Sequence, residues 1–221
     1  MDACYARNVP ALTEAECLLL QSKQAAVIGC GGLGGHLLEL LARIGIGRLV
    51  AVDGDVFDET NLNRQLLSEG SLLGTGKAEA AKRRLAQVNP HVEVHAVPVF
   101  LTEENAEELL RGCDVVLDGI GAREVLAKAC EKLRIPLIHG AVSGWVAQAA
   151  ISLPGDGLID CLYPENADVQ DKSVLSFTPA LCASVQAALC VKLLTGRPVE
   201  TGKLYYFDLL HQEFETIPML L

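Results

Sequence analysis

Short apolar runs alternate with amphipathic stretches along the first 140 residues. The runs at residues 25–28, 48–52 and 115–117 are almost wholly apolar, which is typical of strands buried on both faces of a parallel sheet. The stretches at 34–44 and 77–88 repeat leucine or alanine at helical spacing. This alternation predicts right-handed crossovers and an α/β fold with a Rossmann-like, doubly wound, mostly parallel sheet.

The remaining pattern adds further helices and strands. We expect a helix over residues 12–23 with Thr13 as its N-cap, because Glu14 and Glu16 then meet the positive end of the helix dipole. The other expected helices cover 102–110, 122–133 and 179–194, and the other expected strands cover 91–100, 135–142 and 146–153. Residues 203–220 alternate in two pieces, which predicts a terminal antiparallel hairpin.

One domain accounts for the chain, residues 1–221. This length, with 50% hydrophobic residues, permits one large core. Residues 1–24 form a helical lead-in, and residues 140–221 add C-terminal antiparallel strands and the long helix. That helix carries apolar residues on most faces, so we expect it to be buried, either in the core or across a dimer.

The charge of the chain argues against nucleic acid as a partner. Its 18 basic and 28 acidic residues give a net charge of −10 and are dispersed along the sequence. A nucleic-acid surface normally needs a basic face that displaces counterions from phosphate. Apolar runs such as 25–28 are far shorter than a membrane span, and residues 1–10 lack the apolar stretch of a signal peptide. We therefore expect a cytoplasmic protein that does not enter a membrane.

The eight cysteines are scattered along the chain and form no C-x-x-C pair. This spacing argues against a zinc site and against a disulfide scaffold. Several of these cysteines lie inside apolar patterns, where the simplest interpretation is a small buried side chain.

A glycine-rich turn, GCGGLGG at residues 29–35, follows the first predicted strand and opens a helix. Such a turn lets backbone N–H groups approach phosphate at the start of a helix. The glycines expected to do so are Gly29, Gly31, Gly32 and Gly34. Asp53 and Asp55 end the second strand at the same edge of the sheet, where Asp53 is placed to accept hydrogen bonds from ribose hydroxyls. These features alone fit NAD and ATP equally well.

Three later polar residues, Asn61, Arg64 and Lys77, favour a triphosphate over a dinucleotide. A dinucleotide site seldom needs two further cations. An arginine binds phosphate through its planar fork and a lysine adds a compact charge, and both stabilise the charge that builds on a leaving pyrophosphate. Each residue taken singly is equally well explained as a solvated surface charge. Their order after the glycine turn predicts an ATP site.

The ordered motifs resemble those of the MoeB/ThiF/HesA family of ubiquitin-activating-enzyme-like adenylyltransferases over nearly the whole chain. They are VIGCGGLG at 27–34, VDGDVFDETNLNRQ at 52–65, GTGKAEAAKRRLAQVNP at 74–90, DVVLDG at 114–119, IPLIHGAV at 135–142 and LCASVQAALCVKLLTG at 181–196. The resemblance implies that ATP·Mg²⁺ and the C-terminal glycine carboxylate of a small ubiquitin-like protein ending in Gly-Gly form an acyl-adenylate and pyrophosphate. The implied partner is a sulfur carrier of molybdopterin-type or thiamine-type metabolism.

The resemblance also assigns roles to individual positions. It makes residues 1–221 one adenylation domain, with phosphate contacts at Asn61, Arg64 and Lys77. Arg7, in Tyr5-Ala6-Arg7, matches a family arginine that reaches into the other subunit, which implies a homodimer. The implied catalytic set is Arg7, Arg64, Lys77 and Asp118.

The chain departs from the family after the fourth strand. The family reads D-x-x-D-N there, and its second aspartate holds Mg²⁺, whereas this chain reads Asp118-Gly119-Ile120-Gly121-Ala122. Asp118 fits the first acid, but a glycine at 121 has no side chain to bind a cation. Because magnesium keeps several waters and needs only one or two carboxylates, our hypothesis is that Asp118 does the remaining metal work through water.

Two cysteine features of the family are also missing. Members commonly carry two C-x-x-C pairs for structural zinc, but here only Cys161 survives, with Leu158 at its partner's position, so no zinc is expected. Residues 165–176 lack the cysteine that some relatives use for a thioester or a persulfide. Cys161 or Cys182 is an alternative nucleophile, and packing is the competing interpretation of both.

Other residues leave alternatives open. His139 and His36 are either substrate contacts or structural histidines. Trp145 and Gln148 follow a tight turn near where relatives receive the tail of their protein substrate. A second function class is an ATP-binding or partner-binding module that has lost turnover, as the glycine at 121 suggests. A third is an NAD-dependent oxidoreductase, which only the glycine turn and Asp53 favour.

Overall fold

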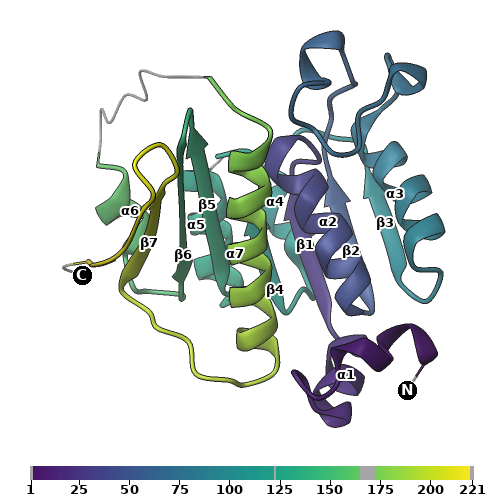
Figure 1. The fold of residues 1–221 in the computed structure, drawn as a ribbon. Helices are drawn as coiled ribbons and strands as arrows, with labels where there is room; N and C mark the ends of the chain where they lie inside the picture. Colours follow the sequence, from purple (N-terminus) through teal and green to yellow (C-terminus); the bar gives the residue numbers. More distant parts are fainter. Residues whose placement is uncertain (1, 122, 165–172, 220–221) are drawn as a thin grey trace.

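A single eight-stranded sheet organises the protein in the order β3-β2-β1-β4-β5-β6-β7-β8 (Figure 1). The structure is a computed structural model that describes residues 2–121, 123–164 and 173–219. The strands are β1 (Gln24–Ile28), β2 (Arg48–Val52), β3 (Glu93–Val97), β4 (Val115–Asp118), β5 (Leu137–Ser143), β6 (Val146–Ser152), β7 (Lys203–Asp208) and β8 (Glu213–Pro218). The predicted strands are therefore all present, each within about four residues of its predicted ends.

The sheet is parallel from β3 to β5 and antiparallel from β5 to β8. The change occurs at the hairpin between β5 and β6, where Ser143 pairs with Val146 across a two-residue turn. Gly144 in that turn has φ of +52°, a conformation that glycine adopts without strain. The mostly parallel sheet with antiparallel C-terminal strands confirms the predicted fold class.

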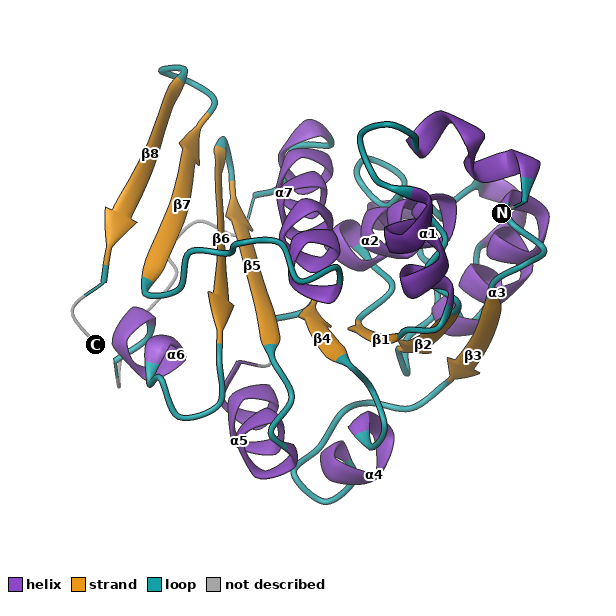
Figure 2. Ribbon diagram, turned by 90° about the horizontal axis from the view of Figure 1, so that it is seen from below, coloured by secondary structure: helices purple, strands orange, loops and turns teal. Residues whose placement is uncertain are grey.

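Helices cover both faces of the sheet (Figure 2). One face carries α1 (Glu14–Gln21), α2 (Gly32–Ile44), α3 (Lys77–Val88) and α7 (Phe177–Leu194), and the other carries α4 (Ala106–Leu110), α5 (Arg123–Leu133) and α6 (Leu158–Leu162). Three short 3-10 helices lie at Ala3–Asn8, Glu59–Asn61 and Gly70–Leu72. Each face buries its own hydrophobic cluster against alternate residues of the strands, as a two-layered core requires.

The long helix α7 is part of the core. By length and composition it is the one described helix that could cross a membrane, but half of it is buried inside the protein. It packs against α2 and against strands β5 and β6. Its buried residues include Cys182, Gln186 and Cys190. The prediction that this helix is buried is confirmed for the face that meets the sheet.

Helix ends follow local sequence signals in most places. Thr13 and Glu16 form a capping box at the start of α1, and α3 ends at Val88 before Asn89 and Pro90. The predicted helix over 102–110 was wrong in its start, because α4 begins only at Ala106. There, the Asn105 side chain accepts a hydrogen bond from the Thr102 N–H at 2.8 Å and closes a turn before the helix. The five-residue helix α6 was not predicted.

Candidate functional site

The glycine turn between β1 and α2 is built for close backbone packing. Gly29 has φ of +90°, and its N–H donates to Val52 O at 2.7 Å. A Cβ added at Gly34 would lie 1.6 Å from Gly29 O, so position 34 has no room for a side chain. No side chain caps the start of α2. Its first N–H groups are therefore available to bind an anion, and the helix dipole favours one.

This turn lies at the topological switch point of the sheet. Strand β1 pairs with β2 on one side and with β4 on the other, and the helices that follow β1 and β4 cover opposite faces (Figure 2). The loop after β4 touches the glycine turn, because a Cβ added at Gly119 would lie 2.7 Å from Ile28 O. Ligands of open α/β sheets bind in the crevice between two such loops. The glycine turn and the loop after β4 therefore meet at the predicted edge of the sheet, and a ligand site between them stays a prediction.

Asp53 holds the glycine turn to the end of β2. One of its carboxylate oxygens accepts a hydrogen bond from Cys30 N–H at 2.7 Å, and the other accepts one from Asp55 N–H at 2.9 Å. A carboxylate has about four lone-pair sites, so these two bonds leave acceptor capacity for a hydroxyl. The predicted ribose contact of Asp53 is not tested by the structure and stays a prediction.

Lys77 and Asp55 form an ion pair with unequal exposure. Lys77 Nζ lies 2.5 Å from Asp55 Oδ2, and the lysine side chain is 7% exposed while the aspartate side chain is 52% exposed. The hydrogen bond from Lys77 lowers the pKa of Asp55. The first residue of α3 therefore supplies a buried positive charge close to the glycine turn. Burial and the Asp53 charge raise the pKa of Cys30, and the Lys77 charge opposes them.

Two buried amide side chains in the segment after β2 keep an unpaired oxygen. Asn61 Nδ2 donates to Asp58 Oδ1 at 2.8 Å, but Asn61 Oδ1 is buried without a partner. Gln65 Oε1 is also buried without a partner, and the Gln65 amide lies next to Gly31. The free atom of Asn61 is an acceptor, which suits a hydroxyl better than a phosphate. The phosphate contact expected of Asn61 stays a prediction, and Gln65 is a site candidate that sequence reasoning missed.

A cavity of about 290 Å³ opens beside the glycine turn. Its lining comes from five places in the chain: Gly32 and Leu33, Arg64, Gly119 to Gly121 with Arg123, Gly140 to Val142, and Val174 with Pro179. Arg64 is held by its own loop, because Nη1 donates to Thr60 O and to Asn63 Oδ1 at 2.8 Å each. Among the described lining residues there are two arginines and no acid. The cavity is therefore suited to an anion.

Asp118 is fully buried at the end of β4 and does not line the cavity. Its Oδ1 accepts hydrogen bonds from the N–H groups of Ile120 at 3.1 Å and Gly121 at 2.8 Å, and its Oδ2 lies 3.2 Å from His139 Nδ1. Both oxygens thus order the loop after β4. No cluster of three or more potential metal ligands exists in the described part of the chain. The described lining residues thus fit an anionic nucleotide, and the Asp118 carboxylate is turned into the protein rather than into the cavity.

His139 belongs to a buried network that ends at the cavity. Its Nε2 lies 2.9 Å from Tyr163 Oη, which also accepts a hydrogen bond from Gln148 Nε2 at 2.5 Å. Burial raises the pKa of Tyr163. The Arg123 guanidinium lies 3.8 Å above the Tyr163 ring. This geometry supports the structural interpretation of His139. It also identifies Arg123 and Tyr163, which no sequence signal pointed to, as candidates for the site.

Arg7 lies at the opposite end of the subunit from the cavity. It is exposed on the 3-10 helix Ala3–Asn8, which packs on the C-terminal end of α2 through Tyr5 at Gly45 and through Asn8 Nδ2, 3.3 Å from Ile44 O. A helix of this length spans about 20 Å, and the glycine turn is at its other end (Figure 1). Arg7 therefore does not reach the cavity of its own subunit. Its predicted reach into a partner's cavity is untested.

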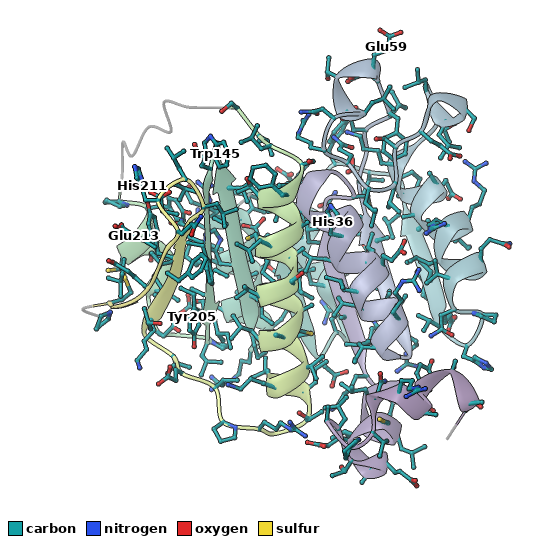
Figure 3. The ribbon with its side chains drawn as sticks, viewed as in Figure 1. His36, Glu59, Trp145, Tyr205, His211 and Glu213 are labelled. Carbon is teal, nitrogen blue, oxygen red and sulfur yellow. The ribbon has the colours of Figure 1, made fainter. Side chains whose placement is uncertain are left out.

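The cysteines and the remaining aromatic candidates separate by burial. Cys182 is fully buried in α7, and burial raises its pKa to about 12, which supports packing over nucleophilic attack. Cys161 is exposed. Trp145 lies at the turn after β5 (Figure 3). Its ring contacts that of Phe177 at a tilt of 50°, with the ring centroids 5.1 Å apart, and both side chains remain partly exposed. His36 is on α2 (Figure 3), and burial lowers the pKa of its imidazole.

Comparison with known proteins assigns the chain to one family. Residues 5–220 match the model of the ThiF family. The chain is 35% identical over 210 residues to the SAMP-activating enzyme E1 of Haloferax volcanii, which covers 90% of this chain and 77% of that protein. It is 34% identical to the sulfur carrier protein adenylyltransferase of Thermus thermophilus, with 90% and 79% covered. The adenylyltransferase and sulfurtransferase MOCS3 of Drosophila yakuba is also 34% identical, but the chain spans only 45% of it.

Solved structures share the fold. The structure of Escherichia coli MccB with ATP superimposes with a TM-score of 0.81 over 99% of this chain and 72% of MccB, at 21% identity. MccB with AMPCPP and MccA gives a TM-score of 0.83 over 98% of this chain and 71% of MccB, at 20% identity. At this identity the likeness concerns the arrangement of the strands and helices.

Proposed function

The chain belongs to the ThiF family and is an ATP-dependent adenylyltransferase of that family, and we propose that its substrate is the C-terminal glycine carboxylate of a small ubiquitin-like sulfur carrier. The observation that carries the proposal is the cavity at the switch point, whose described lining includes two arginines and no acid. An uncapped helix N-terminus and Arg64 meet there, and no described lining residue is acidic. Both reactants are anions, so both are attracted to this cavity.

The proposed reaction joins a carboxylate to a phosphate. One oxygen of the terminal carboxylate attacks the α-phosphorus of ATP, and the bond from that phosphorus to the bridging oxygen of the β-phosphate breaks. The products are an acyl-adenylate and pyrophosphate. The N–H groups at the start of α2, the Lys77 ammonium and the Arg64 guanidinium stabilise the negative charge that moves onto the leaving pyrophosphate. No proton has to move.

A magnesium ion bound to the ATP would shield the phosphate charge during this attack. Both oxygens of Asp118 make contacts within the protein, so any action of this carboxylate on the ion would pass through water. We propose that Asp118 acts on Mg²⁺ in this way.

The shape of the far side of the cavity supports a glycine-ended substrate. Gly140, Ala141 and Val142 of β5 line it with small side chains, which let the backbone of a glycine-ended tail approach the strand closely. Trp145 and Phe177 provide a partly exposed aromatic surface at the same end of the sheet. We propose that the tail of the carrier passes this surface. We also propose a cytoplasmic homodimer in which Arg7 of each subunit completes the other site.

Intact-mass analysis tests the proposal. Candidate carriers ending in Gly-Gly are incubated with the protein, ATP and Mg²⁺, and the carrier is expected to gain the mass of one AMP. A carrier whose last glycine is amidated is the matched control and should gain nothing. ATP–pyrophosphate exchange that depends on the carrier gives a second readout, which Arg64→Ala and Lys77→Ala should each sharply reduce. Tight ATP binding with neither exchange nor mass gain would instead support a module that has lost turnover.

A further inference from the structure

Arg123 brings a second guanidinium into the cavity, from a different element than Arg64. It is the first residue of α5 and lines the cavity beside Gly121. Its Nε is buried and has no hydrogen-bond partner. Within the described residues, no carboxylate forms an ion pair with it. A buried donor on a permanent cation without an anion is a group that a ligand can satisfy.

The guanidinium is held in place by Tyr163. The ring lies 3.8 Å from Arg123 Cζ, which is a close cation–π contact. The ring itself is fixed by its hydroxyl, which is 2.9 Å from His139 Nε2 and 2.5 Å from Gln148 Nε2. His139 in turn contacts the buried Asp118 carboxylate. The charge of Arg123 is therefore set in position before any ligand arrives, as a site for developing or fixed charge requires.

The neighbouring backbone leaves space for this guanidinium. Gly121 has φ of +76°, and a Cβ added there would lie 3.4 Å from Arg123 Nη2. Any larger side chain at position 121 would be strained and would crowd the arginine. Since no described lining residue is acidic, the positive charge of Arg123 is not neutralised within the cavity.

We propose that Arg123 is an oxyanion-binding residue of the adenylation site and that Tyr163 is its positioning residue. The inference rests on the proposed function. The ligand chemistry is an oxygen pair of a carboxylate or a phosphate, which the fork of an arginine binds with two parallel hydrogen bonds. Two sources carry such oxygens, the terminal carboxylate of the carrier and the phosphates of ATP.

Calorimetric titration of the full-length protein separates the two sources. The probes are ATP, pyrophosphate, and a short peptide that ends in a Gly-Gly carboxylate, with the same peptide as its C-terminal amide. In Arg123→Met, we expect at least a tenfold loss of affinity for one class. Loss for ATP and pyrophosphate alone identifies phosphate. Loss of the preference for the acid peptide over the amide identifies the carboxylate.

Variants on α5 and just after α6 control for folding. Lys128→Met removes another cation of α5, which is exposed and paired with Glu103, and should bind all probes like the wild type. Tyr163→Leu should reproduce the loss of Arg123→Met, whereas Tyr163→Phe keeps the ring face and should retain most of the affinity. Thermal melting of each variant excludes unfolded protein. A purely structural role of Tyr163 would make the losses follow the melting temperature.

The outcomes separate this inference from the proposed function. If Arg123→Met binds every probe like the wild type, or if the wild type binds none, the inference is overturned. AMP transfer to a carrier at the wild-type rate by Arg123→Met would also overturn it while leaving the proposed function intact. If Arg123→Met loses anion binding and no carrier is ever adenylated by the wild type, the anion site stands and the proposed function fails.

Discussion

Lys77 Nζ lies 2.5 Å from Asp55 Oδ2, and the two side chains differ strongly in exposure, 7% for the lysine and 52% for the aspartate. The cation is therefore enclosed by the protein, while its counter-ion faces solvent. Removing the exposed partner leaves a buried charge without compensation, but removing the buried partner leaves a carboxylate that water can solvate. The two halves of this ion pair should thus respond differently to substitution.

We predict that Asp55→Asn lowers the free energy of unfolding by about 1–3 kcal/mol, because it leaves the buried Lys77 charge with a weaker partner. Lys77→Met should change stability by less than Asp55→Asn does, since Asp55 is already half exposed. Urea unfolding without nucleotide measures both. Equal losses in the two variants would contradict the unequal burial.

The same pair gives a prediction for nucleotide binding. Lys77→Met removes the buried cation near the glycine turn and should weaken ATP binding by about 1.5–3 kcal/mol, roughly ten- to a hundredfold. Asp55→Asn keeps the lysine and should bind ATP no worse than the wild type. Calorimetry at fixed ionic strength checks this order of affinities, because screening changes charge interactions.

Gly34→Ala should damage the turn directly. Its Cβ would lie 1.6 Å from Gly29 O, so the backbone of the turn has to move. We expect the free energy of unfolding to fall by at least ~2 kcal/mol and ATP binding to be lost with it. Gly70→Ala is the matched control, because a Cβ there meets nothing within 4 Å. Similar melting temperatures for the two variants would show that the turn tolerates a side chain.

Much of the fold could be predicted because its signals are local. The helix α3 runs from Lys77 to Val88 as predicted, since its alanines repeat at helical spacing and Pro90 follows its end. The glycine turn and Asp53 were predicted to lie at one edge because parallel strands end there, and Asp53 indeed binds the Cys30 N–H.

The site residues that could not be predicted depend on contacts between segments that are distant in the sequence. Arg123 and Tyr163 are forty positions apart, on or just after α5 and α6, and they meet only because both elements cover the same face of the sheet. Neither has a neighbouring pattern that marks it. The inward orientation of the Asp118 carboxylate is equally non-local, since it depends on His139 of the next strand.

Cysteine alkylation should follow burial. Cys4 and Cys161 are exposed, whereas Cys182 and Cys190 are fully buried, and burial raises the pKa of Cys182 to about 12. Under native conditions at pH 8, iodoacetamide should modify Cys4 and Cys161 long before the buried thiols, because the thiolate is the reactive form. Peptide mass mapping over time gives the order. Early modification of Cys182 would restore it as a candidate nucleophile.

The contact between Glu16 and Arg197 predicts a pH dependence of stability. The hydrogen bond from Arg197 is the largest cause that lowers the pKa of Glu16, from 4.5 to about 2. A carboxyl group whose pKa is lowered by folding stabilises the protein above its unfolded pKa, and this contribution is lost as the pH falls from about 4.5 towards 2. The stability difference between the wild type and Glu16→Gln should therefore be constant above pH 6 and shrink below pH 4.5. Chemical unfolding across this range measures it, and a difference that grows on acidification would contradict the contact.

Asp118 has a structural role in the loop after β4 and a proposed role at Mg²⁺. Measurements of stability and of the Mg²⁺ requirement separate the two. The Asp118 oxygens accept hydrogen bonds from Ile120 and Gly121 and contact His139, so Asp118→Asn should lower the free energy of unfolding by about 1–3 kcal/mol by disturbing the loop after β4. If this structural role is the whole role, the Mg²⁺ concentration for half-maximal ATP–pyrophosphate exchange should match that of the wild type. If Asp118 also acts on the metal through water, that concentration should rise at least severalfold.

Gln186→Leu is the control for a disturbed end of β4. It removes the 3.0 Å hydrogen bond from Gln186 to the Asp118 backbone carbonyl and leaves the Asp118 carboxylate untouched. A raised Mg²⁺ requirement in both variants would assign the effect to the loop, whereas a rise in Asp118→Asn alone would assign it to the carboxylate.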